Sequence, residues 1–206
     1  MEILRQFGAI PISSGVLKSV LADYKSVNTK VHALEKEGVL IRLKKGLYVV
    51  SPKVSGMTLS PELIANHLYG PSYVSMESAL RYYGLIPERV YSVRSMTTKH
   101  NRSFENEIGL FIYKEVSDGY FAVGITQSKT AAPFLIATPE KALCDMIAYT
   151  SGLSLRSIKA LEAYLTDDLR FDMDALLRFD TSIIAACATV GKKKTELQNL
   201  IKLIER

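Results

Sequence analysis

The side chains best suited to bind a charged ligand are the lysines and arginines in the first quarter of the chain. Residues 1–56 contain nine Lys or Arg and four Asp or Glu, and they carry the whole net charge of +5, since the remaining residues contain 17 of each. Positive charge gathered in one segment indicates a polyanionic partner, most commonly a nucleic acid. The alternative is an ordinary solvated surface.

Side-chain patterns for catalysis are absent from the sequence. It has no G-x-x-x-x-G-K-[ST] phosphate-binding loop and no G-x-S-x-G nucleophile turn. His32, His67 and His100 lie more than thirty residues apart, so no local metal-binding pattern is present. The only [DE]-x-K triplet, Asp23–Lys25, lies between two expected helices rather than on the adjoining strands that a nuclease would need. The sequence therefore predicts a protein that is not an enzyme and has no metal site and no cofactor.

The basic side chains fall on three expected helices and a hairpin. Hydrophobic spacing and capping residues predict helices over residues 2–7, about 14–22 and 26–37. Two β-branched runs, 39–43 and 47–50, flank Lys44-Lys45-Gly46 and predict a hairpin with a basic tip. This order is typical of a winged helix-turn-helix domain, which we expect to occupy residues 1–55.

A winged helix-turn-helix domain binds duplex DNA by placing its third helix in the major groove. We expect Asn28 and Thr29 to read base edges, and His32 lies on the same polar face. Basic residues of this region would neutralise phosphates or enter the minor groove; these are Lys25, Lys30, Lys36, Arg42, Lys44 and Lys45. The alternative is a winged-helix scaffold that uses this face to bind a protein.

The remaining residues, 56–206, are expected to form an α+β domain. The helix-start signatures Ser60-Pro61-Glu62 and Thr138-Pro139-Glu140 enclose three expected strands, over residues 90–98, 108–116 and 120–126. Asp118-Gly119 predicts a hairpin turn between the last two strands, and so the sheet is expected to be small and mostly antiparallel. Further helices are expected over 154–165, 173–179, 182–190 and 196–205, the last opened by a capping box at Thr195.

Two basic clusters in this second region could also touch DNA or a partner. One is the loop after the first expected strand, with Lys99 and Arg102, and the other is the run Lys192, Lys193 and Lys194. An exposed loop and a solvated charge run are the plainer explanations.

Four sequence segments resemble the AbiE-type antitoxins, the regulators of type IV toxin–antitoxin systems. They are GVLIRLKKGLYVV (38–50), YVSMESALRYYGLIPE (73–88), SMTTK (95–99) and ATPEKALCDMIAY (137–149). The resemblance implies a bacterial transcriptional repressor that binds repeats in its own promoter and can self-associate on that DNA. It also implies that the protein counteracts a nucleotidyltransferase-like toxin without requiring a stable complex.

A different hypothesis is a winged-helix regulator whose second domain binds an effector or another protein, and a nucleic-acid enzyme is a third. The longest apolar runs are far shorter than the ~20 residues that a membrane span needs. The N-terminus lacks a secretory signal pattern, and two cysteines fit a reducing compartment. We therefore expect a cytoplasmic protein that does not bind membranes.

Overall fold

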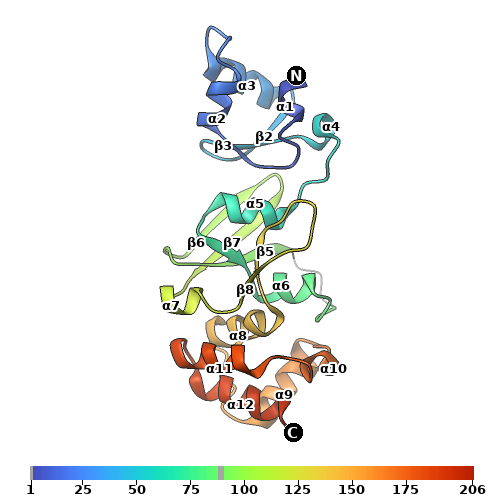
Figure 1. Cartoon of the computed structure of the whole chain (residues 1–206), viewed down its shortest axis with the longest axis vertical. Coiled ribbons are helices and arrows are strands. Elements are labelled where there is room, and N and C mark those ends of the chain that lie inside the picture. Colours follow the sequence, from blue (N-terminus) through green and yellow to red (C-terminus); the bar gives the residue numbers. More distant parts are fainter. Residues whose placement is uncertain (1, 88–90) are drawn as a thin grey trace.

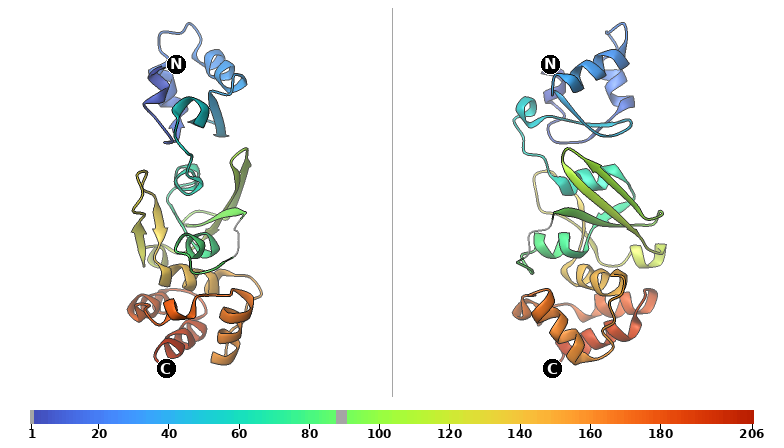
Figure 2. Two further views of the ribbon diagram at one scale, coloured as in Figure 1. Left: turned by 90° about the vertical axis from the view of Figure 1, so that its right-hand side faces the viewer. Right: turned by 180° about the vertical axis from the view of Figure 1, so that it is seen from behind.

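The computed structural model describes residues 2–87 and 91–206, and the fold is α+β. The molecule is elongated: the N-terminal elements lie at one end, a six-stranded sheet lies in the middle, and the last helices lie at the other end (Figure 1). The two ends of the chain are therefore far apart, as the views in Figure 2 also show.

The N-terminal quarter contains the three expected helices and the expected hairpin. Its elements are α1 (Glu2–Arg5), β1 (Ile12–Ser13), α2 (Ser14–Val20), α3 (Val27–Lys36), β2 (Leu40–Lys44) and β3 (Leu47–Val50). The three strands are antiparallel in the order β1-β3-β2. The hydroxyl of Ser13 accepts a hydrogen bond from the Val16 N–H and so fixes the start of α2. Gly38, with φ +68°, ends α3 in the left-handed conformation.

The hairpin β2–β3 contributes to two hydrophobic cores. Leu40 and Val50 belong to a small core with Leu17, Leu34 and other side chains of the three helices. The remaining inward side chains of the hairpin pack into the larger core of the rest of the molecule; these are Leu43, Leu47 and Val49. The hairpin is therefore shared between the N-terminal elements and the region that follows.

The segment 51–60, which follows the hairpin, contains a short helix. Helix α4 (Pro52–Ser55) begins after Ser51, whose hydroxyl accepts a hydrogen bond from the Lys53 N–H. Helix α5 (Pro61–Leu68) then begins where the sequence predicts, because the Ser60 hydroxyl accepts from the Leu63 N–H, 3.1 Å away.

The central sheet is larger than predicted, and it is mixed: most of its strand pairs are antiparallel, as expected, but two are parallel. Its strands are β4 (Ser72–Val74), β5 (Ser92–Thr97), β6 (Arg102–Asn106), β7 (Gly109–Glu115), β8 (Ile125–Gln127) and β9 (Leu135–Ala137). They lie in the order β6-β7-β5-β4-β9-β8, and the pairs β4–β9 and β5–β7 are parallel while the others are antiparallel. Parallel pairs join distant segments, and local periodicity does not reveal such crossovers.

Two local predictions for this region are wrong. The expected turn at Asp118-Gly119 is the first turn of helix α7 (Asp118–Phe121), in which the Phe121 N–H donates to the Ser117 carbonyl. The strand expected over 120–126 is therefore reduced to β8, since the buried Tyr120 side chain lies on this helix. Residue 90 of the strand expected over 90–98 lies outside the described residues.

The remaining helices of the second region include one that is almost entirely buried, α8 (Pro139–Tyr149). The others are α6 (Met76–Tyr82), α9 (Ile158–Ala163), the π-helical turn η1 (Tyr164–Asp168), α10 (Met173–Leu176), α11 (Thr181–Val190) and α12 (Lys194–Ile204). Helix α8 lies between the sheet and the C-terminal helices (Figure 1), and every residue from Lys141 to Tyr149 is buried. The capping box expected at Thr195 is not used, because α12 begins at Lys194, after the left-handed residue Lys193.

Candidate nucleic-acid interface

Helix α3 has one buried face and one polar face. Val31 and Leu34 are buried in the small core, whereas Asn28 and Thr29 are exposed in the first turn. The hydroxyls of Thr29 and Ser26 share a hydrogen bond of 2.9 Å, which fixes the Thr29 side chain at the start of the helix. Within the described part of the chain the Asn28 amide makes no hydrogen bond, so its donor and acceptor groups are open to a ligand.

Most of the predicted cations around α3 and the hairpin are exposed. The ammonium group of Lys30 lies over the Tyr24 ring, 5.1 Å from its centre, which holds this lysine beside the first turn of α3. His32 faces Glu35, with 3.6 Å between Nδ1 and Oε2. The other cations form no ion pair with any described residue; these are Lys25, Lys36, Arg42 and Lys45.

Lys44 differs from the neighbouring Lys45, because its side chain turns toward the second region. Its ammonium group donates a hydrogen bond to the Leu68 carbonyl at the end of α5. It also lies 5.7 Å from the centre of the Phe104 ring. Burial lowers the pKa of Lys44, and the positive charges of Arg102 and Lys99 lower it further.

Lys44, Lys99 and Arg102 form a cluster that we call the cation trio. The Lys99 ammonium group donates to the Gly70 carbonyl at 2.5 Å and lies 5.4 Å from the Tyr69 ring centre. The Arg102 guanidinium lies 5.1 Å from the centre of the Phe104 ring. No described carboxylate forms an ion pair with any of the three. Three like charges thus meet without a protein counterion, and this arrangement favours an anionic partner.

The structure separates the three lysines of the run Lys192–Lys194. Lys193 turns inward, and its ammonium group donates to the carbonyls of Ile147, Thr150 and Leu153 at 2.6–3.1 Å. Its ammonium group therefore satisfies carbonyls at the end of α8 and in the turn that follows, and does not face a partner. Lys192 lies over the Tyr149 ring at 5.3 Å, and Lys194 is exposed.

A buried ion pair lies beneath these surfaces, and the sequence interpretation did not single it out. Lys141 Nζ and Asp145 Oδ1, one turn apart on α8, are separated by 3.3 Å, and both side chains are fully buried. The hydroxyls of Tyr73 and Ser75 donate to Asp145 Oδ2 at 3.0 and 2.6 Å. Two charges four residues apart in the apolar run of 137–149 are the signal that could have revealed it.

The buried pair is part of the scaffold. Burial raises the pKa of Asp145, and the Lys141 charge with the hydroxyl donors opposes that rise. Lys141 Nζ also donates to the Tyr120 carbonyl at 2.9 Å. The hydrogen bonds to Tyr73 and Tyr120 join α8 to β4 and α7, and neither charge of the pair is exposed.

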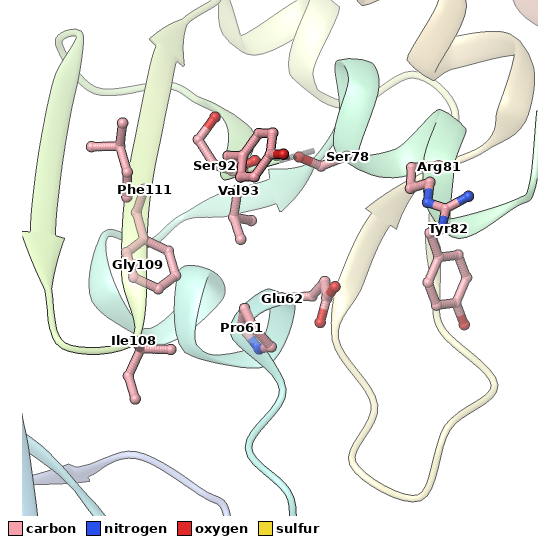
Figure 3. A pocket seen from close by; sticks show the side chains of 12 residues that line it. Pro61, Glu62, Ser78, Arg81, Tyr82, Ser92, Val93, Ile108, Gly109 and Phe111 are labelled. Atoms are coloured by element: carbon pink, nitrogen blue, oxygen red, sulfur yellow. Dashed lines mark hydrogen bonds between the residues drawn. The ribbon is translucent and has the colours of Figure 1, made fainter. Parts of the chain in front are cut away.

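A pocket of about 410 Å³ lies between α5, α6 and the strands β5 and β7 (Figure 3). Val93 and Phe111 lie on its strand side, and Glu62 and Arg81 come from the helices (Figure 3). The Ser78 hydroxyl is already bonded to the Ser92 carbonyl and the Arg94 N–H. Across residues 2–87 and 91–206 no group of three or more His, Cys, Asp or Glu could hold a metal ion.

Helices long and apolar enough to cross a membrane do not occur in the described residues. No protein-family model matches the sequence, and no curated protein does. The fold is similar to that in the crystal structure of the Rv2827c protein from Mycobacterium tuberculosis, with a TM-score of 0.63 and 12% sequence identity. The match covers 98% of this chain and 73% of the other, so nearly all of this chain has its counterpart in part of that structure.

Proposed function

We propose that this chain is a DNA-binding transcriptional autoregulator whose first 55 residues act as a winged helix-turn-helix domain. The observation that carries the proposal is the polar face of α3, where Asn28 and Thr29 are exposed and Asn28 lines a hollow with Tyr48 of the basic hairpin. A helix of this kind fits the major groove, and side chains in its first turn reach base edges. The hairpin cations Arg42 and Lys45 would then hold the sugar–phosphate backbone.

The cation trio extends this positive surface from the hairpin onto the six-stranded sheet. Lys44 belongs to β2, while Lys99 lies in the loop after β5 and Arg102 begins β6. We assign the trio to a phosphate contact outside the major groove. Burial lowers the pKa of Lys44 most, and a bound phosphate would offset the repulsion from Arg102 and Lys99 that lowers it further.

Footprinting tests the DNA-binding proposal on the full chain. Hydroxyl-radical cleavage of the DNA upstream of the chain's own gene should show protected minor-groove and backbone positions over a repeated or palindromic segment. Lys45→Gln should weaken protection, whereas Lys159→Gln on the distant helix α9 should not. A cleavage pattern that is the same with and without protein would overturn the proposal.

The antitoxin role is the second half of the proposal, and it rests on the sequence resemblance to AbiE-type antitoxins. In that role the chain has no catalytic function, and its second region neutralises a nucleotidyltransferase-like toxin in the cytoplasm. Expression of this chain should restore growth to cells that produce the protein encoded beside it. Continued growth arrest at equal expression levels of the two proteins would contradict the antitoxin role. It would not contradict the DNA-binding role.

A second candidate function is effector binding by the second region, and the pocket of Figure 3 favours it. The pocket has the volume of a small-molecule site, and among the described residues Arg81 forms no ion pair within it. Effector binding predicts that a small molecule raises the melting temperature and changes operator affinity, since a ligand that binds only the folded state stabilises it. Arg81→Ala should abolish both effects.

A further inference from the structure

Two adjoining hollows lie on the side of the molecule where strand β7 meets the ends of α8 and α11. The larger one, about 510 Å³, is lined by residues that include Asn101, Ser117 and Lys192. The smaller one, about 250 Å³, is lined by residues that include Met76 and Ile112. Lys114 and Tyr149 line both hollows, so the two hollows adjoin at these side chains, and we call the pair of hollows the Lys114 groove.

The larger hollow has an excess of positive charge. Lys114 is half-buried on β7 and forms no ion pair with the residues that the structure describes. Lys192 is held over Tyr149 because the next residue, Lys193, is anchored to the carbonyls at the end of α8. The one carboxylate that lines this hollow, Glu115, lies 3.2 Å from His100 Nδ1.

Neutral hydrogen-bonding groups complete the larger hollow. The Ser117 hydroxyl is exposed there, and among the described residues it makes no hydrogen bond. The Asn101 amide oxygen accepts from the Glu115 N–H at 2.8 Å, which leaves its NH₂ group able to donate. Two ammonium groups with hydroxyl and amide donors are the chemistry that binds a phosphate group.

The smaller hollow offers an apolar surface beside that anion site. Ile112, Met76 and the buried Tyr149 ring line it, and the Arg94 side chain there is held by Glu77, 3.2 Å away. Met76 has φ +52°, a left-handed conformation that is rare for a residue with a side chain. Backbone strain of this kind is concentrated at ligand sites, where the surrounding structure holds it in place.

We propose that the Lys114 groove binds a phosphorylated organic molecule of nucleotide size. The phosphate lies between Lys114 and Lys192, and the planar apolar part lies against Met76, Ile112 and Tyr149. The combined volume of the two hollows suits a ligand of this size. This proposal is independent of DNA binding, because none of these residues belongs to α3, the hairpin or the cation trio.

Calorimetric titration of the full chain with adenosine 5′-monophosphate tests the proposal, with adenosine and inorganic phosphate as separate probes. The nucleotide should bind at least about tenfold more tightly than phosphate, since only the nucleotide fills both hollows, and adenosine should bind weakest. Lys114→Gln and Lys192→Gln should each weaken nucleotide binding about tenfold or more, because each removes a charged hydrogen bond. Lys194→Gln is the matched control: this neighbouring lysine does not line the groove, and its replacement should leave the affinity unchanged.

Three results would overturn the proposal. One is the absence of nucleotide binding at millimolar concentration by a chain with a native circular dichroism spectrum. Another is equal affinity for the nucleotide and for phosphate, which would mean that the groove binds only the anion. The third is unchanged nucleotide affinity in both Lys114→Gln and Lys192→Gln. The affinity for operator DNA is measured for the same two variants and should not change. If both variants bind operator DNA more weakly and the unaltered chain binds no nucleotide, the groove is a DNA contact and not a nucleotide site.

Discussion

The side-chain amide of Asn106 donates a hydrogen bond to the main-chain carbonyl of Leu43 over 3.0 Å. This bond joins the end of β6 to the hairpin strand β2, at the place where Lys44 reaches the carbonyl of Leu68. The basic hairpin is therefore fixed to the central sheet by polar contacts as well as by its buried leucines. The proposed DNA-binding surface in the N-terminal quarter and the region that follows it should thus respond to each other.

Replacement of Leu47 by Ala tests this connection. Leu47 lies on β3 but packs in the larger core, so the cavity should destabilise the whole chain by about 2–5 kcal/mol. Urea unfolding followed by circular dichroism measures the loss, and hydrogen exchange should show faster exchange in α8 as well as in α3. Leu177→Ala is the control, because Leu177 is 64% exposed and its replacement should change the free energy of unfolding little. Faster exchange confined to residues 1–55 would contradict the shared core.

The buried pair of Lys141 and Asp145 should matter far more for stability than an exposed ion pair would. Lys141→Met leaves the Asp145 carboxylate buried without its counterion, which should cost about 3–5 kcal/mol in urea unfolding. A double variant, Lys141→Met with Asp145→Leu, should recover part of that loss because no charge remains buried. A cost below about 1 kcal/mol for the single variant would mean that the pair is solvated in solution.

Alkaline pH should unfold the protein through its buried tyrosines. Burial and the nearby Asp145 raise the pKa of Tyr149 to about 12, and burial with Glu77 and Asp168 raises that of Tyr164 to about 12. Because an unfolded tyrosine ionises near about pH 10, the stability from the neutral phenols is complete below that pH and is lost as the pH rises toward 12. Absorbance at 295 nm should show that these phenolates form only as the pH approaches 12. The helical circular dichroism signal should be lost over the same pH range. A single ionisation step near pH 10 with intact helices would be inconsistent with these buried phenols.

Cations of the hairpin should contribute to DNA affinity regardless of sequence. Arg42→Gln and Lys45→Gln should weaken binding to operator and scrambled duplexes equally, since phosphates are present in both. Each variant should reduce the slope of log affinity against log salt by about 0.9 for the phosphate contact it loses. Lys159→Gln, exposed on α9, should leave both the affinity and the slope unchanged. If the slope of log affinity against log salt is the same in all variants, the phosphate contacts do not lie on the hairpin.

Local sequence signals predicted the elements that depend on local interactions. Ser60-Pro61 and Thr138-Pro139 begin α5 and α8 because a hydroxyl caps each helix through a bond spanning three residues. The strand β9 and its parallel pairing with β4 were not predicted, since three residues of a short strand carry no periodicity and their partner lies over sixty residues away.

The candidate site was predictable in composition but not in the direction of each side chain. Charge balance identified the lysines of residues 1–56, yet it treated Lys44 and Lys45 alike, although only Lys44 turns toward Leu68. The same holds for Lys192 and Lys193, which are adjacent in sequence but point to different partners. Only tertiary contacts decide which lysine of a run stays exposed.

The measurement that tests the central claim most directly is fluorescence-anisotropy titration of the full chain against the DNA upstream of its own gene. A scrambled duplex, two salt concentrations and the variants Asn28→Ala and Thr29→Ala complete the experiment. We predict preferential operator binding that weakens with salt, and a loss of about 1–3 kcal/mol of discrimination for each variant that removes a base contact. Equal affinity of the unaltered chain for operator and scrambled DNA, or full discrimination in both variants, would contradict the assignment of α3 as the helix that reads the sequence.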